Sequence, residues 1–163
     1  MTHESENPMS ANKAKPFPWL CPRCLKVDVV PHVTEYAIDV RHDGILHSLV
    51  IPDLAVPTCH ACGERVFTSD VDERVSAALR ARLGLLTPRQ IQEGIQALGM
   101  RPSDLAARLG VATDTVSRWA DGAQIQSRAM DNFLRVFFAV PEARAVLTGP
   151  GQDPGIGAHA VVS

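Results

Sequence analysis

Aromatic side chains, long apolar runs and cysteines are all scarce in this chain, and the missing apolar runs restrict where it works. No apolar run approaches the roughly 18 to 20 residues that a membrane-spanning helix needs. The N-terminal segment is polar and lacks the apolar centre of a signal peptide. We therefore expect a cytoplasmic protein without a membrane partner.

Groupings that are typical of catalysis are also missing. No Ser/His/Asp grouping and no glycine-rich phosphate loop occurs in the sequence. The six histidines are scattered without ligand spacing, at His3, His32, His42, His47, His60 and His159. We therefore expect no enzymatic activity.

The excess of one sign of charge is small over the whole chain but larger within its parts. The formal net charge is −2, which does not by itself indicate a polyanion partner. Residues 1–70 carry six Lys and Arg against nine Asp and Glu, whereas residues 74–144 carry ten Arg against six Asp and Glu. The C-terminal half is therefore the part whose charge favours contact with a nucleic acid.

The four cysteines form two C-x-x-C pairs, Cys21 with Cys24 and Cys59 with Cys62. Each pair places two thiolates on one turn, so two turns together complete a tetrahedral site of four sulfur ligands. Such a site suits Zn²⁺ and leaves no open coordination position for catalysis. We predict one structural zinc ion per chain, whose binding supports the folding of a sheet with few large side chains.

Two disulfides, four free thiols or a redox C-x-x-C motif are the alternatives for these cysteines. Disulfides are rare in cytosolic proteins. A redox motif is expected within a thioredoxin-like βαβ pattern, which is not evident here. His60, inside the second pair, is interpreted as exposed or as a neighbour of the ligands, and not as a ligand.

The region between the cysteine pairs has the pattern of a small antiparallel sheet. Strands are predicted at 27–30, 36–41 and 45–51. Asp43-Gly44 is the residue pair preferred in a tight hairpin turn. The sequence therefore predicts a β-hairpin whose ends are held together by the metal.

Five helices are expected after the sheet. The first, over 69–83, has acidic residues in its first turn and arginines in its last, and we interpret it as a connector. The second begins with Thr87 as N-cap and Pro88 as the first helical residue. The others are expected from about 102, from about 113 and over 127–138.

The expected fold class is therefore α+β, with a β domain followed by helices. The predicted division of the chain is a disordered tail at 1–16, a zinc-binding β domain at 17–68, a connector helix at 69–86, a DNA-binding domain at 87–148 and a flexible tail at 149–163.

Residues 102–122, PSDLAARLGVATDTVSRWADG, predict two short amphipathic helices joined at a corner. Apolar residues of the first helix recur at helical spacing. Gly110 stands where a helix end needs a left-handed backbone. The second helix buries Val116 and Trp119, which are three positions apart. This pattern is typical of a helix-turn-helix, which points to DNA.

The other face of the second helix is predicted to enter a major groove. Its residues are Thr113, Asp114, Ser117 and Arg118. Arg118 is the main candidate because an arginine binds guanine O6 and N7 together. Asp114 is able to accept a hydrogen bond from a cytosine amino group.

Phosphate contacts are predicted at two other helix starts. Arg101 is expected to hold a phosphate by charge at the first motif helix. Gln126, Ser127 and Arg128 are expected to hold one through charge and free backbone N–H groups at the next helix. A solvated helix start is the alternative for these three residues.

Several segments together resemble the MqsA/YgiT-type antitoxins over roughly residues 17–147: CPRC, the hairpin, VPTCHACGE, LLTPRQIQ and LAARLGVATDTVSRW. The resemblance implies an N-terminal zinc-binding domain joined to an Xre-like, lambda-repressor-like helix-turn-helix domain of about five helices. It implies a transcriptional repressor that forms a homodimer through its C-terminal domain and autoregulates its operon. We expect the dimer to read a palindromic operator on double-stranded DNA. The zinc domain is expected to bind and neutralise a toxin protein.

The chain departs from this family's pattern in three places. Ala112 stands where a capping serine is usual, so Thr113 is expected to cap the recognition helix. The first motif helix starts with Arg101-Pro102 in place of Thr-Gln, and Ala120 replaces an acidic residue. The operator preference is therefore open.

An alternative function belongs to a different class. In it the zinc domain is a toxin-neutralising protein-interaction module, and specific DNA binding is secondary or absent. The apolar Phe133, Phe137 and Phe138 fit either a dimer contact or an intramolecular core. The residues leave both functions open.

Overall fold

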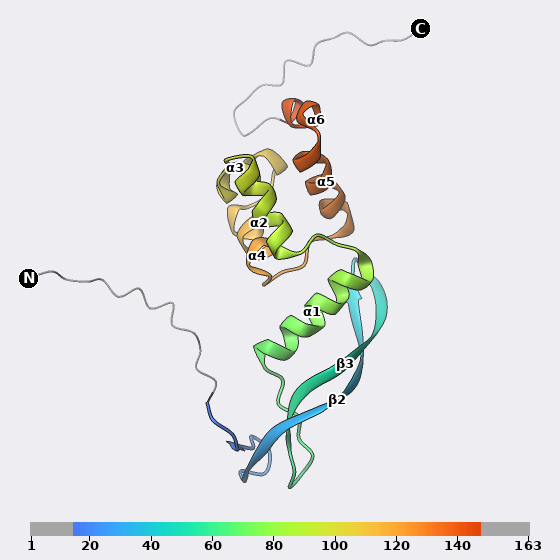
Figure 1. Ribbon diagram of the computed structural model, residues 1–163, viewed down its shortest axis with the longest axis vertical. Coiled ribbons are helices and arrows are strands. Elements are labelled where there is room, and N and C mark those ends of the chain that lie inside the picture. The colour runs from blue at the N-terminus through green and yellow to red at the C-terminus, as the bar shows by residue number, and fades with distance from the viewer. Residues whose placement is uncertain (1–14, 148–163) are drawn as a thin grey trace, which may run out of the picture. The chain divides into compact units, whose positions relative to one another are not determined.

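The computed structural model describes residues 15–147, as a three-stranded sheet followed by six helices (Figure 1). The strands are β1 (Trp19–Leu20), β2 (Val27–His42) and β3 (Ile45–Cys59). The helices are α1 (Ser69–Leu83), α2 (Pro88–Ala97), α3 (Pro102–Leu109), α4 (Thr113–Asp121), α5 (Arg128–Ala139) and α6 (Pro141–Val146). The α+β class is confirmed. The predicted tails lie outside the described residues, except for 15–16.

The hairpin strands are longer than the sequence pattern predicts. The predicted segments 27–30 and 36–41 are one continuous strand, β2, which runs through Pro31. A proline inside a strand removes one ladder hydrogen bond, so it is tolerated where the strand has a free edge. The strand β1 pairs with β2 only near Val27 and Val29, so this edge of β2 is free beyond them. Pro31 therefore interrupts the pattern without ending the strand.

The turn between β2 and β3 has the predicted chemistry. Asp43 and Gly44 have φ angles of 50° and 78°, which are the two positive values that a tight type I′ hairpin turn requires. Along β3, the buried positions change from Leu49 and Ile51 to Leu54 and Val56. Asp53, with φ of 50°, lies at this change. One extra residue at a β-bulge explains why the buried face switches from odd to even positions.

The described chain divides into two compact units. The first comprises the chain up to Tyr36 together with Pro52–Asp72. The second joins Ala37–Ile51, the turn half of the hairpin, to the chain from Glu73 onward. This division differs from the predicted boundary at 68 and 69. One reason is a long-range hydrogen bond within the second unit, between the hairpin turn and the start of α5.

The core of the second unit is built from the amphipathic helices. The helix α4 packs on both α2 and α3, and α5 packs on α2. The residues expected to face inward do so: Leu105 and Ala106 of α3, and Val116 and Trp119 of α4, are buried. Phe137 of α5 is 1% exposed and belongs to this intramolecular core.

One glycine allows α2 and α5 to approach closely. A Cβ atom at Gly94 would lie 2.7 Å from the ring of Phe138. This distance is shorter than van der Waals contact, so only glycine fits at this position without a shift of the ring.

A buried polar network joins three segments of the second unit. The carboxylate of Asp131 accepts hydrogen bonds from the Leu86 backbone N–H (2.7 Å), from Gln126 Nε2 (3.0 Å) and from Arg135 Nε (2.8 Å). Burial opposes the charged form, but the hydrogen bonds from Arg135, Leu86 and Gln126 outweigh it and lower the pKa of Asp131. The network fixes the start of α5 against the loop that precedes α2.

Candidate metal centre and nucleic-acid interface

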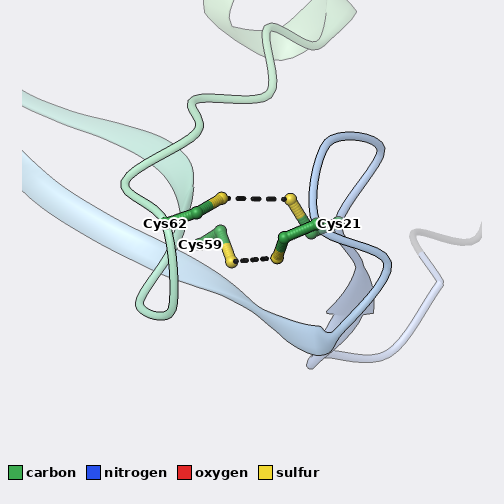
Figure 2. Close-up of side chains that lie close together, drawn as sticks. Cys21, Cys59 and Cys62 are labelled. Carbon is green, nitrogen blue, oxygen red and sulfur yellow. Dashed lines mark hydrogen bonds between the residues drawn. The ribbon is translucent and has the colours of Figure 1, made fainter.

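Four cysteine side chains converge in the first unit (Figure 2). Their Sγ atoms all lie within 4.8 Å of one another. The Sγ atoms of Cys21 and Cys62 are 3.6 Å apart, and those of Cys24 and Cys59 are 3.7 Å apart. A disulfide needs about 2.05 Å, so these thiols are free, as the sulfur positions of a four-ligand metal site require. The predicted ligands therefore form one candidate metal site.

The first C-x-x-C pair lies on a turn closed by two backbone hydrogen bonds. The N–H of Leu25 donates to the carbonyl of Cys21 (3.0 Å), and the N–H of Cys21 donates to the carbonyl of Lys26 (2.8 Å). Leu25 has φ of 59°, a left-handed conformation that costs a residue with a side chain about 1–2 kcal/mol.

The second C-x-x-C pair repeats this geometry with different residues. The N–H of Gly63 donates to the carbonyl of Cys59, and the N–H of Cys59 donates to the carbonyl of Glu64, both at 2.8 Å. Gly63, with φ of 75°, stands at the place that Leu25 occupies in the first turn. Two equivalent turns facing one another present four sulfur atoms to one point.

The site is partly enclosed by the sheet. Cys21 and Cys59 are buried, whereas Cys62 is exposed. Buried Val29 packs with them. The backbone N–H of His60 donates to the carbonyl of Asp28 (3.0 Å), which ties the second turn to β2. The side chain of His60 is exposed, and among the described residues the candidate ligand group contains the four cysteines alone.

The environment changes the acidity of the ligands unequally. The backbone N–H groups of Cys24 and Arg23 donate to the sulfur of Cys21 and lower the pKa of that thiol to about 7, against the opposing effect of burial. Burial raises the pKa of the Cys59 thiol. A metal ion binds the thiolate form, so loading this site releases protons.

The second candidate site is the pair of helices α3 and α4. Gly110 follows α3 with φ of 71°, and its N–H donates to the carbonyl of Ala106, as expected for a helix end. The N-cap of α4 is Ala112, which makes no side-chain cap, and Thr113 is the first helical residue. The prediction that Thr113 caps this helix is therefore wrong. A residue with helical backbone angles lies one position too late to act as the N-cap.

The predicted major-groove residues lie on the outer side of α4. Thr113, Asp114 and Arg118 are exposed, and Ser117 is half-buried. Val116 is buried on the opposite side of the same helix. The structure therefore leaves this set available to a ligand.

Both arginines predicted to contact DNA from α3 and α4 are already paired. An Arg118 Nη2 to Asp114 Oδ2 distance of 2.8 Å defines an i,i+4 ion pair. Arg101 makes a bidentate contact with Asp104, of 3.2 Å from Nε and 3.0 Å from Nη2. These hydrogen bonds lower the pKa of Asp104. Sequence reasoning missed both pairs, although opposite charges at i,i+3 and i,i+4 spacing were the available signal.

The three residues predicted at the start of α5 have structural partners. Gln126 is 0% exposed, and its Nε2 donates to the Leu86 carbonyl (2.8 Å), so its side chain is not available to a phosphate. We remove it from the predicted contacts. Ser127 is the N-cap of α5 and its side chain accepts from the Met130 N–H. Arg128 donates its backbone N–H to Asp43 (2.7 Å) and its guanidinium to the Leu83 carbonyl.

One further residue that positions α4 was not found from the sequence. Arg80 of α1 is 4% exposed, and its Nη2 donates to the carbonyls of Gly122 (3.3 Å) and Gln124 (3.2 Å), just after α4 ends. Burial lowers the pKa of Arg80. No local pattern indicates a contact between residues more than 40 positions apart.

Comparison with known proteins adds no family assignment: no family model and no curated protein matches this sequence. Within residues 15–147, none of the helices is both long and apolar enough to span a membrane.

Proposed function

We propose that this protein is a sequence-specific regulator of transcription that binds double-stranded DNA through an Xre-like helix-turn-helix formed by α3 and α4. One observation carries the proposal. Buried Val116 and Trp119 fix one side of α4 to the core, and its other side exposes Thr113, Asp114 and Arg118. A short helix held in this way, after a glycine corner, is suited to a major groove.

The proposed mode of action is repression by a homodimer. Two copies of α4 would enter successive major grooves, about 34 Å apart, on a palindromic operator. The basic balance of residues 74–144, with ten Arg against six Asp and Glu, supports the second unit as the DNA-binding part. We further propose an antitoxin-type protein that represses its own operon, which follows from the family resemblance of the sequence.

The metal that we propose for the four-cysteine site is Zn²⁺. With Zn–S bonds of about 2.3 Å, a tetrahedral site places sulfur atoms about 3.8 Å apart. The observed separations of 3.6 and 3.7 Å agree with this geometry. Four thiolates leave no open position, so the role proposed for zinc is structural: it would hold the two turns together.

A selection from a randomised duplex library tests the DNA-binding proposal for any operator sequence. The zinc-loaded wild-type protein is expected to enrich a palindrome with two half-sites about one helical turn apart. Arg118→Ala is expected to lose the base preference at one position in each half-site. Enrichment of no motif by the wild-type protein contradicts the proposal.

A protein-interaction role for the first unit is a second candidate function, favoured by one observation. Large apolar side chains are exposed in this unit: Phe17, Leu20, Leu25, Val27, Val33 and Phe67. Exposed apolar groups that gather in one unit are typical of protein contacts. This candidate is the toxin-neutralising zinc module.

The test of this second function is co-expression with the product of an adjacent short reading frame. Leu25→Ser, at a side chain that is 71% exposed, is expected to weaken the complex. Val146→Ser, at a side chain that is 74% exposed in the second unit, is the matched control and should leave it intact. Absence of a complex with the wild-type protein contradicts the interaction role.

A further inference from the structure

The arginines on the proposed DNA-binding face are neutralised by carboxylates of their own helices. Arg101 is paired with Asp104, and Arg118 with Asp114. All four side chains are substantially exposed, from 42% for Asp104 to 80% for Arg101. Within residues 15–147, the Asp114 side chain makes no ion pair other than the one with Arg118. Nothing in the packing of α4 therefore requires this carboxylate.

The two charges of this pair act differently on phosphate and on bases. A phosphate offers only acceptors and a negative charge, so the Asp114 carboxylate repels the phosphate that Arg118 attracts. A G·C base pair offers acceptors at guanine O6 and N7 and a donor at the cytosine amino group. The remaining N–H groups of Arg118 are suited to the guanine, and the Asp114 oxygens are suited to the cytosine.

We infer that Asp114 is a specificity-determining residue that acts through Arg118, by making non-specific phosphate contacts unfavourable while permitting contact with a G·C base pair. The inference rests on the proposed DNA-binding function. It explains why an anion stands in the middle of a surface that approaches a polyanion. It assigns to Asp114 an effect on scrambled DNA that is larger than its effect on the operator.

The test compares Asp114→Asn with a matched control, Glu93→Gln. Glu93 forms an i,i+4 pair with Arg89 of the same 2.8 Å length on α2, so both substitutions remove one negative charge and free one arginine. Binding is measured with the duplex enriched by the wild-type protein and with a scrambled duplex. Thermal melting of each variant establishes that it is folded.

For Asp114→Asn, we expect the affinity for scrambled DNA to rise on the order of threefold. The slope of log affinity against log salt for scrambled DNA should steepen by up to about 0.9, which is one added phosphate contact. The affinity for the enriched duplex should stay constant or fall, so the specificity ratio falls. Glu93→Gln should change neither duplex by more than its uniform effect of charge.

A second comparison separates action through Arg118 from a general charge effect. In an Arg118→Ala background, Asp114→Asn should no longer raise the affinity for scrambled DNA. An equal gain on both duplexes, or a gain that persists without Arg118, overturns the inference and leaves the DNA-binding proposal intact. If the wild-type protein prefers no duplex, it is the proposed function itself that fails.

Discussion

The carboxylate of Asp43, at the tip of the β-hairpin, accepts a 2.7 Å hydrogen bond from the backbone N–H of Arg128, which lies 85 residues later at the start of α5. This contact gives α5 an N-terminal carboxylate from a distant part of the sequence, where the helix dipole favours a negative charge. It also means that one N–H group predicted to hold a phosphate already has a partner within the protein.

Loss of this contact is expected to destabilise the second unit. Asp43→Gly keeps a residue that tolerates the φ of 50° but removes the acceptor, so the free energy of unfolding should fall by about 0.5–2 kcal/mol, as for other helix caps. Asp53→Gly is the matched control, because Asp53 has the same φ of 50°. Equal effects of the two substitutions in chemical denaturation would show that the contact with Arg128 contributes nothing.

Removal of the metal is expected to unfold the first unit and leave the helices folded. The four ligands come from two turns that only the folded chain brings together, so binding free energy is folding free energy. Native mass spectrometry should show one zinc ion per chain, and a chelator should abolish the β signal in circular dichroism. Cys21→Ser should lose the ion, whereas His60→Ala should keep it. Full retention of the sheet after chelation would contradict a structural role.

The two metal-binding turns should respond in opposite ways to substitution at their equivalent left-handed residues. Gly63→Ala introduces a Cβ atom at φ of 75° and should lower the stability of the zinc-loaded protein by about 1–2 kcal/mol. Leu25→Gly removes a Cβ atom at φ of 59° and should be neutral or slightly stabilising, because its relief of strain offsets the added freedom of the unfolded chain. Thermal melting measures both. A destabilising Leu25→Gly would indicate that the exposed leucine side chain itself makes a stabilising contact.

Acid is expected to weaken the second unit through Asp131. The folded-state pKa of this group is lowered from its ordinary value of 3.8, so its contribution to stability is present above pH 3.8 and is lost as the pH falls through the lower folded value. Asp131→Asn should reduce the free energy of unfolding at pH 7 by about 1–3 kcal/mol, because Arg135 and the Leu86 N–H lose a charged acceptor. The difference between wild type and variant should narrow below pH 4 in urea unfolding. A constant difference from pH 7 to pH 3 would contradict this role.

The metal ligands and helix boundaries were predictable because their signals are local. Two C-x-x-C pairs define four ligands by spacing alone. The helix α1 has the predicted bounds, and Thr87 caps α2 through a hydrogen bond from the Gln90 N–H, as its sequence indicates. The short helix α6 was not predicted, and it shows none of the long apolar periodicity that identified the others.

Contacts between distant residues were not predictable in the same way. The bond between Asp43 and Arg128, and the contact of Arg80 with the loop after α4, join residues whose spacing carries no periodic signal. Gln126 was misassigned for the same reason: its buried partners, Leu86 and Asp131, are brought to it by folding. A polar residue next to a helix start has the same local sequence whether it faces solvent or a core.

A titration of labelled DNA tests the central claim most directly. The zinc-loaded protein is added to a duplex from upstream of its own reading frame and to a scrambled duplex, at two salt concentrations. We predict a preference for the upstream duplex that persists at the higher salt, because contacts with base edges depend less on salt than contacts with phosphates. Equal binding to both duplexes that disappears at the higher salt would contradict specific recognition by α4.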